Sequence, residues 1–121
     1  MARIMVVDDE EDIRESMKTA LESLGHEAIT ANDGRDCLEK LKREKVDLVL
    51  LDFFMPEMSG REVLERIRAD PKLRKLKVAM MTVARMSEAG EAEMKKLGIA
   101  DYISKPIDLA DFKERIRKLL G

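Results

Sequence analysis

Five short apolar segments alternate with five amphipathic segments along the chain. The apolar segments are residues 4–7, 28–31, 48–51, 78–81 and 102–103. The first, third and fourth are apolar at every position, which is typical of strands buried on both faces of a parallel sheet. The fifth is too short to stand alone, and we include it because of its place in the alternation.

The segments between the apolar runs carry the spacing of helices. Apolar residues recur three or four positions apart at residues 13, 17, 21 and 24, and again at residues 109, 112, 116 and 119. Residues 59–62 (SGRE) form a capping box, and Asp12, Asp33 and Asp108 are candidate N-caps. Glycines at positions 25, 98 and 121 stand where helices should end.

Strict alternation of strands and helices predicts an α/β fold, in which helices cover both faces of a parallel sheet. We expect one domain over residues 1–121, because this length is ordinary for a single domain and no linker or repeat interrupts the pattern. Ligands of such folds bind at the carboxyl ends of the strands. The residues at those ends therefore bear most directly on function.

Composition removes several classes of protein. The 23 basic and 25 acidic residues leave a net charge of −2, which gives no reason to expect direct nucleic-acid binding. No apolar run approaches the roughly 20 residues of a membrane span, and residues 1–7 are too short for a signal peptide. A single cysteine, Cys37, excludes an intrachain disulfide, and a single histidine, His26, excludes a His-rich metal centre. We expect a cytoplasmic globular protein without membrane insertion.

Polar side chains follow four of the apolar segments. Asp8 and Asp9 follow the first, Asp52 the third and Thr82 the fourth, while Lys105 lies just beyond the fifth. Carboxylates gathered at one edge of a sheet repel one another, and a hard divalent cation relieves that repulsion. Oxygen ligands favour Mg²⁺ or Mn²⁺ over zinc. For Lys105, a plain ion pair with Asp52 is the structural alternative.

A carboxylate beside a metal, a lysine and a hydroxyl suits phosphoryl transfer. Asp52 would be the nucleophile that forms an acyl phosphate. The cation and Lys105 would neutralise phosphoryl oxygens, and Thr82 would donate a hydrogen bond to another. Positioning and electrostatics carry most of the catalysis in such reactions.

These residues resemble the receiver domains of two-component response regulators, in particular the single-domain, chemotaxis-regulator-like type. The resemblance covers the whole chain and rests on four motifs in order: residues 6–10 (VVDDE), 51–60 (LDFFMPEMSG), 81–82 (MT) and 104–106 (SKP). It implies a flavodoxin-like, doubly wound sheet of five parallel strands in the order 2-1-3-4-5, with five helices. It also implies a cis peptide bond before Pro106.

The resemblance further implies the roles of the site residues. Asp52 would be phosphorylated by a sensor histidine kinase or a histidine phosphotransfer protein, with Thr82 and Lys105 as the other catalytic residues. Mg²⁺ would be held by Asp9, Asp52 and the backbone carbonyl of Phe54, and Asp8 would reach it mainly through water. The chain would not be an enzyme in the ordinary sense, because it would catalyse only its own phosphorylation and dephosphorylation.

The family's switch implies a response to phosphorylation. Thr82 would move toward the phosphoryl group and Tyr102 would turn inward, which would change the surface of the fourth helix, fifth strand and fifth helix for a downstream protein that the sequence does not name. An ordinary half-exposed strand aromatic is the other interpretation of Tyr102. The fourth helix, residues 87–97, has few large apolar residues and contains Gly90, so we expect it to be mobile.

One residue departs from the family pattern. Val83 follows Thr82 where the family usually has Ala or Gly. A branched side chain at this position should crowd the approach to Asp52, so we expect slow labelling by small phosphodonors and a long-lived acyl phosphate.

Three other interpretations compete with this one: a docking module, a true enzyme and a DNA-binding regulator. A receiver fold can act as a docking module without phosphorylation. A haloacid-type phosphatase needs a second Asp where Phe54 stands, and nucleotide sites need glycine motifs that are absent. A flavodoxin needs a hydroxyl-rich loop where Asp8 and Asp9 lie. A DNA-binding regulator needs an output domain; the chain stops soon after Lys105, which favours a stand-alone receiver over an excised domain.

Overall fold

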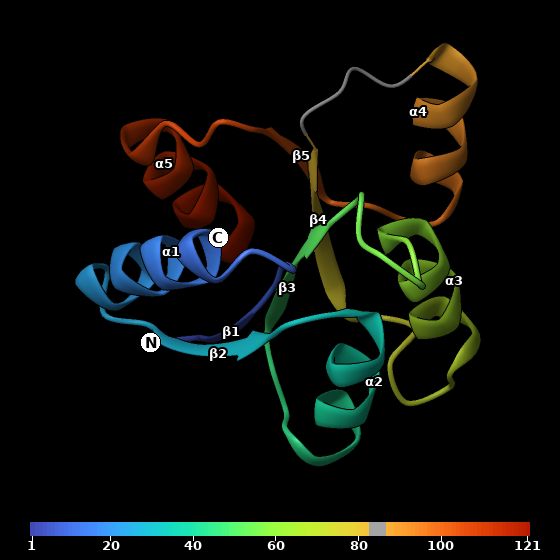
Figure 1. Ribbon diagram of the computed structural model, residues 1–121, viewed down its shortest axis with the longest axis horizontal. Helices are drawn as coiled ribbons and strands as arrows, with labels where there is room; N and C mark the ends of the chain where they lie inside the picture. Colours follow the sequence, from blue (N-terminus) through green and yellow to red (C-terminus); the bar gives the residue numbers. More distant parts are fainter. Residues whose placement is uncertain (83–86) are drawn as a thin grey trace.

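The computed structural model describes residues 1–82 and 87–121 (Figure 1). In these residues five strands and five helices alternate along the sequence. The elements are β1 (Arg3–Val7), α1 (Glu11–Ser23), β2 (Glu27–Ala31), α2 (Gly34–Arg43), β3 (Leu48–Asp52), α3 (Gly60–Ala69), β4 (Lys77–Thr82), α4 (Glu88–Lys96), β5 (Asp101–Ser104) and α5 (Leu109–Leu120). Each predicted strand is present and extends one residue beyond one or both of its predicted ends.

The strands pair in parallel in the order β2-β1-β3-β4-β5. The predicted flavodoxin-like fold is therefore confirmed. Val7 at the end of β1 is in register with both Ala31 and Leu51, and Asp52 at the end of β3 is in register with Met81. This register brings the carboxyl ends of the central strands to one edge of the sheet.

Helices cover both faces of the sheet. Figure 1 shows α1 and α5 on one side and α2, α3 and α4 on the other. Alternate strand residues point to opposite sides: Ile4 and Val6 pack with Phe112 of α5, whereas Met5 and Val7 pack with Ile67 of α3. Since both faces are buried, the central strands have no polar alternation.

Most of the predicted helix starts are confirmed. The side chains of Asp33, Ser59 and Asp108 each accept a hydrogen bond from a backbone N–H in the first turn of the helix that follows. The prediction for Asp12 is wrong, because α1 begins at Glu11 and Asp12 lies inside its first turn. The run of acids before α1 offers several cap candidates, and spacing alone does not choose among them.

The fourth helix rests on few contacts, as its composition predicts. Met94 is its buried residue, and the Ser87 hydroxyl caps its first turn by accepting from the Gly90 N–H. Gly98 follows the helix with a φ of +75°, a left-handed conformation that glycine adopts readily. Val83 lies outside the described residues.

No helix in residues 1–82 or 87–121 has the length and apolar character that crossing a membrane requires.

Candidate functional site

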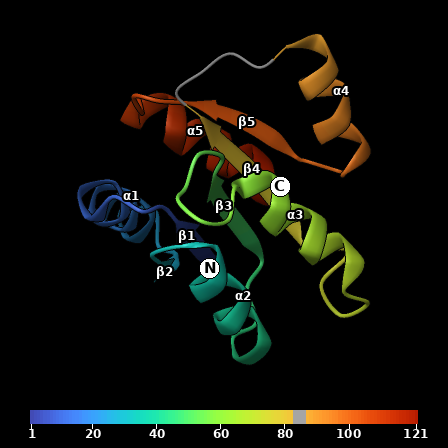
Figure 2. The ribbon, with the colours of Figure 1, turned by 45° about the vertical axis from the view of Figure 1, so that its right-hand side comes forward.

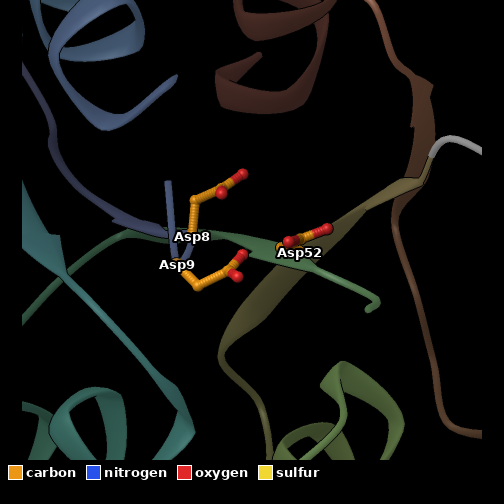
Figure 3. A group of neighbouring side chains, drawn as sticks. All are labelled: Asp8, Asp9 and Asp52. Atoms are coloured by element: carbon orange, nitrogen blue, oxygen red, sulfur yellow. The ribbon is translucent and has the colours of Figure 1, made fainter. Parts of the chain in front are cut away.

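Three carboxylates meet at the carboxyl edge of the sheet. Asp52 is the last residue of β3, and Asp8 and Asp9 follow directly on β1. Figure 3 shows the three side chains next to one another, and one carboxylate oxygen from each lies within 4.8 Å of the others. Asp8 is fully buried and Asp52 is 4% exposed, whereas Asp9 is open to solvent. The site therefore has a buried floor and one accessible acid at its rim.

Lys105 provides positive charge to this cluster. Its Nζ lies 2.6 Å from Asp8 Oδ2 and 3.3 Å from Asp52 Oδ1, and its side chain is 9% exposed. The ion pair with Asp52 is present, but the closer partner is Asp8, which the sequence did not indicate. The Lys105–Pro106 peptide bond is cis, as the resemblance implies.

Asp8 is held in place by the start of α1. Its Oδ1 accepts a hydrogen bond from the Glu10 N–H at 2.9 Å, which is the short-range turn that aspartate favours. Its backbone carbonyl accepts from Nη1 of Arg14 at 2.7 Å. These contacts fix the acidic loop against the first helical turn. Nothing in the sequence around Arg14 distinguishes it from other basic helix residues, and sequence reasoning missed it.

Burial and electrostatic repulsion raise the pKa of Asp52. Burial, followed by the negative charge of Asp8, raises the pKa of Asp52 to about 6, although Lys105 opposes the shift. Lys105 responds in the opposite sense: burial lowers its pKa, but the hydrogen bond from Lys105 to Asp8 and the charges of Asp52 and Asp8 outweigh this, and its pKa is raised. The carboxylates thus hold more negative charge than one lysine balances.

The donor set fits a magnesium ion. All three side chains offer hard carboxylate oxygens, and their mutual repulsion is the electrostatic condition that a divalent cation relieves. Mg²⁺ usually binds through few protein ligands and keeps several waters. A site with two buried acids and one exposed acid is compatible with this mode of coordination.

Thr82 lies beside the lysine loop. It is the last residue of β4, pairs in register with Ser104 and is 6% exposed. Its backbone carbonyl accepts a hydrogen bond from the Lys105 N–H at 2.9 Å. The structure therefore brings Thr82 and Lys105 to the same edge as Asp52.

Gly60 supports the backbone around Asp52. A Cβ atom at this position would lie 2.3 Å from the Asp52 carbonyl oxygen and 2.8 Å from Phe53 Cα. The Gly60 N–H donates to the Phe53 carbonyl at 2.8 Å. In Figure 2 the loop between β3 and α3 curls over the end of β3 and returns to it at the start of α3. Only a residue without a side chain permits this close return.

Phe54 and Tyr102 differ in their surroundings. The Phe54 side chain is 53% exposed and meets the ring of Phe53 edge to face, with 4.9 Å between centroids. Tyr102 is half-buried and packs against the core on the α3 side. Its hydroxyl is buried and has no hydrogen-bond partner among the described residues. Burial, with a smaller contribution from Glu91, raises the Tyr102 pKa.

Comparison with known proteins identifies the family of this chain. The family of response regulator receiver domains matches residues 4–117, and the chain belongs to this family. Such domains are the receiving modules of two-component signalling.

Individual relatives share this architecture. The alkaline phosphatase synthesis transcriptional regulatory protein PhoP of Bacillus subtilis is 34% identical over 118 residues, which are 98% of this chain and 48% of PhoP. The polar-differentiation response regulator DivK of Brucella anthropi is 33% identical over 98% of this chain and 95% of DivK. The structure of chemotaxis protein CheY4 from Vibrio cholerae superposes with a TM-score of 0.91, at 28% identity and 98% coverage of both chains. The chain spans about half the length of some curated relatives and nearly all of others.

Proposed function

We propose that Asp52 accepts a phosphoryl group from the phosphohistidine of a sensor histidine kinase or a histidine phosphotransfer protein. The observation that carries this proposal is the convergence of a buried carboxylate, two neighbouring acids and the Lys105 ammonium at the open edge of the sheet. An ordinary structural ion pair would not need a third acid that faces solvent.

The chemistry follows from the positions of these groups. An Asp52 carboxylate oxygen attacks the phosphorus in line with the donor, so an O–P bond forms while the N–P bond to the donor histidine breaks. The electron pair of the broken bond stays on the imidazole nitrogen. Lys105, 3.3 Å from Asp52 Oδ1, stabilises charge on a phosphoryl oxygen, and the hydroxyl of Thr82 donates to another. In the autophosphatase step, water attacks the phosphorus of the acyl phosphate, the O–P bond to Asp52 breaks, and the Asp52 carboxylate is regenerated as inorganic phosphate leaves.

Asp8, Asp9 and Asp52 would hold Mg²⁺, with the Phe54 carbonyl as a further ligand. The ion, when bound, supplies charge neutralisation for the phosphoryl oxygens. The exposed Asp9 is the acid best placed to test this assignment. Asp9→Ala should weaken Mg²⁺ binding by about tenfold and slow labelling, because it removes a direct ligand. An unchanged affinity in a Mg²⁺ titration would place the metal elsewhere.

Phosphorylation would then shift Thr82 and Tyr102 between two arrangements and alter the surface of α4, β5 and α5 for a downstream protein. Two observations support this. The buried Tyr102 hydroxyl has no hydrogen-bond partner among the described residues. The neighbouring α4 contributes one buried residue and is loosely held.

The decisive experiment is labelling with acetyl phosphate and Mg²⁺. Wild type should gain the mass of one phosphoryl group, released by hydroxylamine as expected of an acyl phosphate, and Asp52→Asn should gain none. Asp47→Asn, an exposed acid at the other end of β3, is the matched control and should label normally. Equal labelling of Asp52→Asn would refute the assignment. Absence of labelling in the wild type would favour a docking module that works without phosphorylation.

A further inference from the structure

A groove with an apolar floor runs between α2, α3 and the loop after α3. Its largest hollow has a volume of about 570 Å³ and is floored by Leu38, Met58 and Leu73. Two further hollows, of about 320 and 380 Å³, continue it along Leu41 and the loop before β3. Leu73 lines all three hollows, so they form one continuous surface, here called the α2/α3 groove.

Basic side chains form the rims of this groove. Arg35, Arg43, Lys45 and Lys72 line it, and all four are exposed. Within residues 1–82 and 87–121 none of the four makes an ion pair. This accumulation of positive charge contrasts with the net charge of −2 on the whole chain.

The acids that line the groove are already engaged. Glu44 pairs with Arg3 at 2.8 Å, and the Asp70 carboxylate accepts the Lys72 backbone N–H at 2.9 Å. Glu39 lies 3.5 Å from Lys42, another basic residue of the groove lining. The groove therefore presents unpaired cations beside an apolar floor, and its charge is complementary to an acidic ligand.

We propose that the α2/α3 groove binds an acidic amphipathic helical segment of a partner protein. The apolar floor takes leucine-like side chains spaced along one helix face, and the basic rims pair with carboxylates on the flanks. A nucleic acid would leave the apolar floor unused. A second copy of this chain fits poorly, because the large exposed apolar side chains of the described residues, Met1, Phe54 and Leu109, lie on separate elements.

The proposal does not rest on phosphorylation of Asp52. The groove lies along α2 and α3, whereas the acids of the site lie at the carboxyl edge of the sheet, and the surface proposed for output is formed by α4, β5 and α5. The groove would thus be a second docking surface. Binding to Asp52→Asn should equal binding to wild type, which separates failure of this proposal from failure of the phosphorylation proposal.

The test uses a fluorescent peptide of about 16 residues with leucines at helical spacing and glutamates on the flanks. Its binding to the full chain is measured by fluorescence anisotropy. We expect saturable binding that weakens with added salt, and a loss of about tenfold in the double variant Arg43→Glu, Lys72→Glu. Lys75→Glu is the matched control: Lys75 is exposed in the same loop as Lys72 but does not line the groove, so affinity should stay within about twofold.

Four results would overturn the proposal. The first is no saturable binding of the peptide at millimolar protein. The second is equal affinity for a scrambled peptide of the same composition or for an oligothymidine, which would indicate a nonspecific polyanion surface. The third is an equal loss of affinity in Lys75→Glu and in the double variant. Amide shifts in an NMR titration should cluster at Leu38 and Leu73, and shifts confined to α4 and α5 would also contradict it.

Discussion

Replacing Asp52 by Asn should stabilise the metal-free protein at neutral and alkaline pH. Asp52 is 4% exposed, and burial followed by the charge of Asp8 raises its pKa from 3.8 to about 6. A carboxyl group whose pKa is higher in the folded than in the unfolded state opposes folding once it ionises. A difference of about two pKa units corresponds to roughly 3 kcal/mol of unfolding free energy.

The size of this stabilisation depends on pH in a defined window. Below about pH 3.8 the carboxyl is protonated in both states and imposes no penalty. Between pH 3.8 and about 6 it is ionised mainly in the unfolded state, so the penalty grows, and above pH 6 the penalty is complete. The advantage of Asp52→Asn should therefore fall from about 3 kcal/mol at pH 8 to roughly 0.5 kcal/mol at pH 4. The weakened contact with Lys105 will reduce the gain at high pH somewhat.

Urea unfolding followed by circular dichroism, with EDTA present, measures this difference at each pH. Glu15→Gln is the control, because Glu15 is exposed on α1 and makes no ion pair in the described part of the chain. Its effect should stay within about 0.5 kcal/mol at every pH. If Asp52→Asn is no more stable than wild type at pH 8, or if its gain in stability is independent of pH, burial and repulsion do not raise the pKa of Asp52.

Three further substitutions test the site. Lys105→Gln removes the ammonium group that lies 2.6 Å from the buried Asp8 carboxylate. The variant should lose about 3 kcal/mol of unfolding free energy, measured by urea unfolding with EDTA present. An unchanged unfolding midpoint would mean that another group neutralises Asp8. Gly60→Ala puts a methyl group 2.3 Å from the Asp52 carbonyl oxygen. The variant should lose about 2 kcal/mol of unfolding free energy and should be labelled more slowly by acetyl phosphate. Wild-type stability and labelling would show that the loop adjusts freely. Val83→Ala should speed both labelling and decay of the acyl phosphate, and unchanged or slower rates would show that Val83 does not crowd Asp52.

Much of the fold can be predicted from the sequence, because strands and helix starts depend on local, periodic sequence patterns. Apolar runs without alternation predicted the buried parallel strands, and Asp33, Ser59 and Asp108 marked helix starts by bonding to backbone within the next turn. The prediction of Asp12 as an N-cap was wrong, because several consecutive acids precede or begin α1 and the local capping pattern does not distinguish among them. Parallel topology gathers the carboxyl ends of the strands at one edge of the sheet, so the sequence predicts that Asp8 and Asp52 lie close together.

Contacts between segments far apart in the chain follow from the tertiary structure and not from local sequence signals. Lys105 bonds more closely to Asp8 than to Asp52, although 97 positions separate the pair. The need for glycine at position 60 comes from the returning loop, which passes within 2.3 Å of where a Cβ would lie. The raised pKa of Asp52 depends on how completely neighbouring elements exclude water. Distance and burial enter these energies directly, and neither is a property of residue type or spacing.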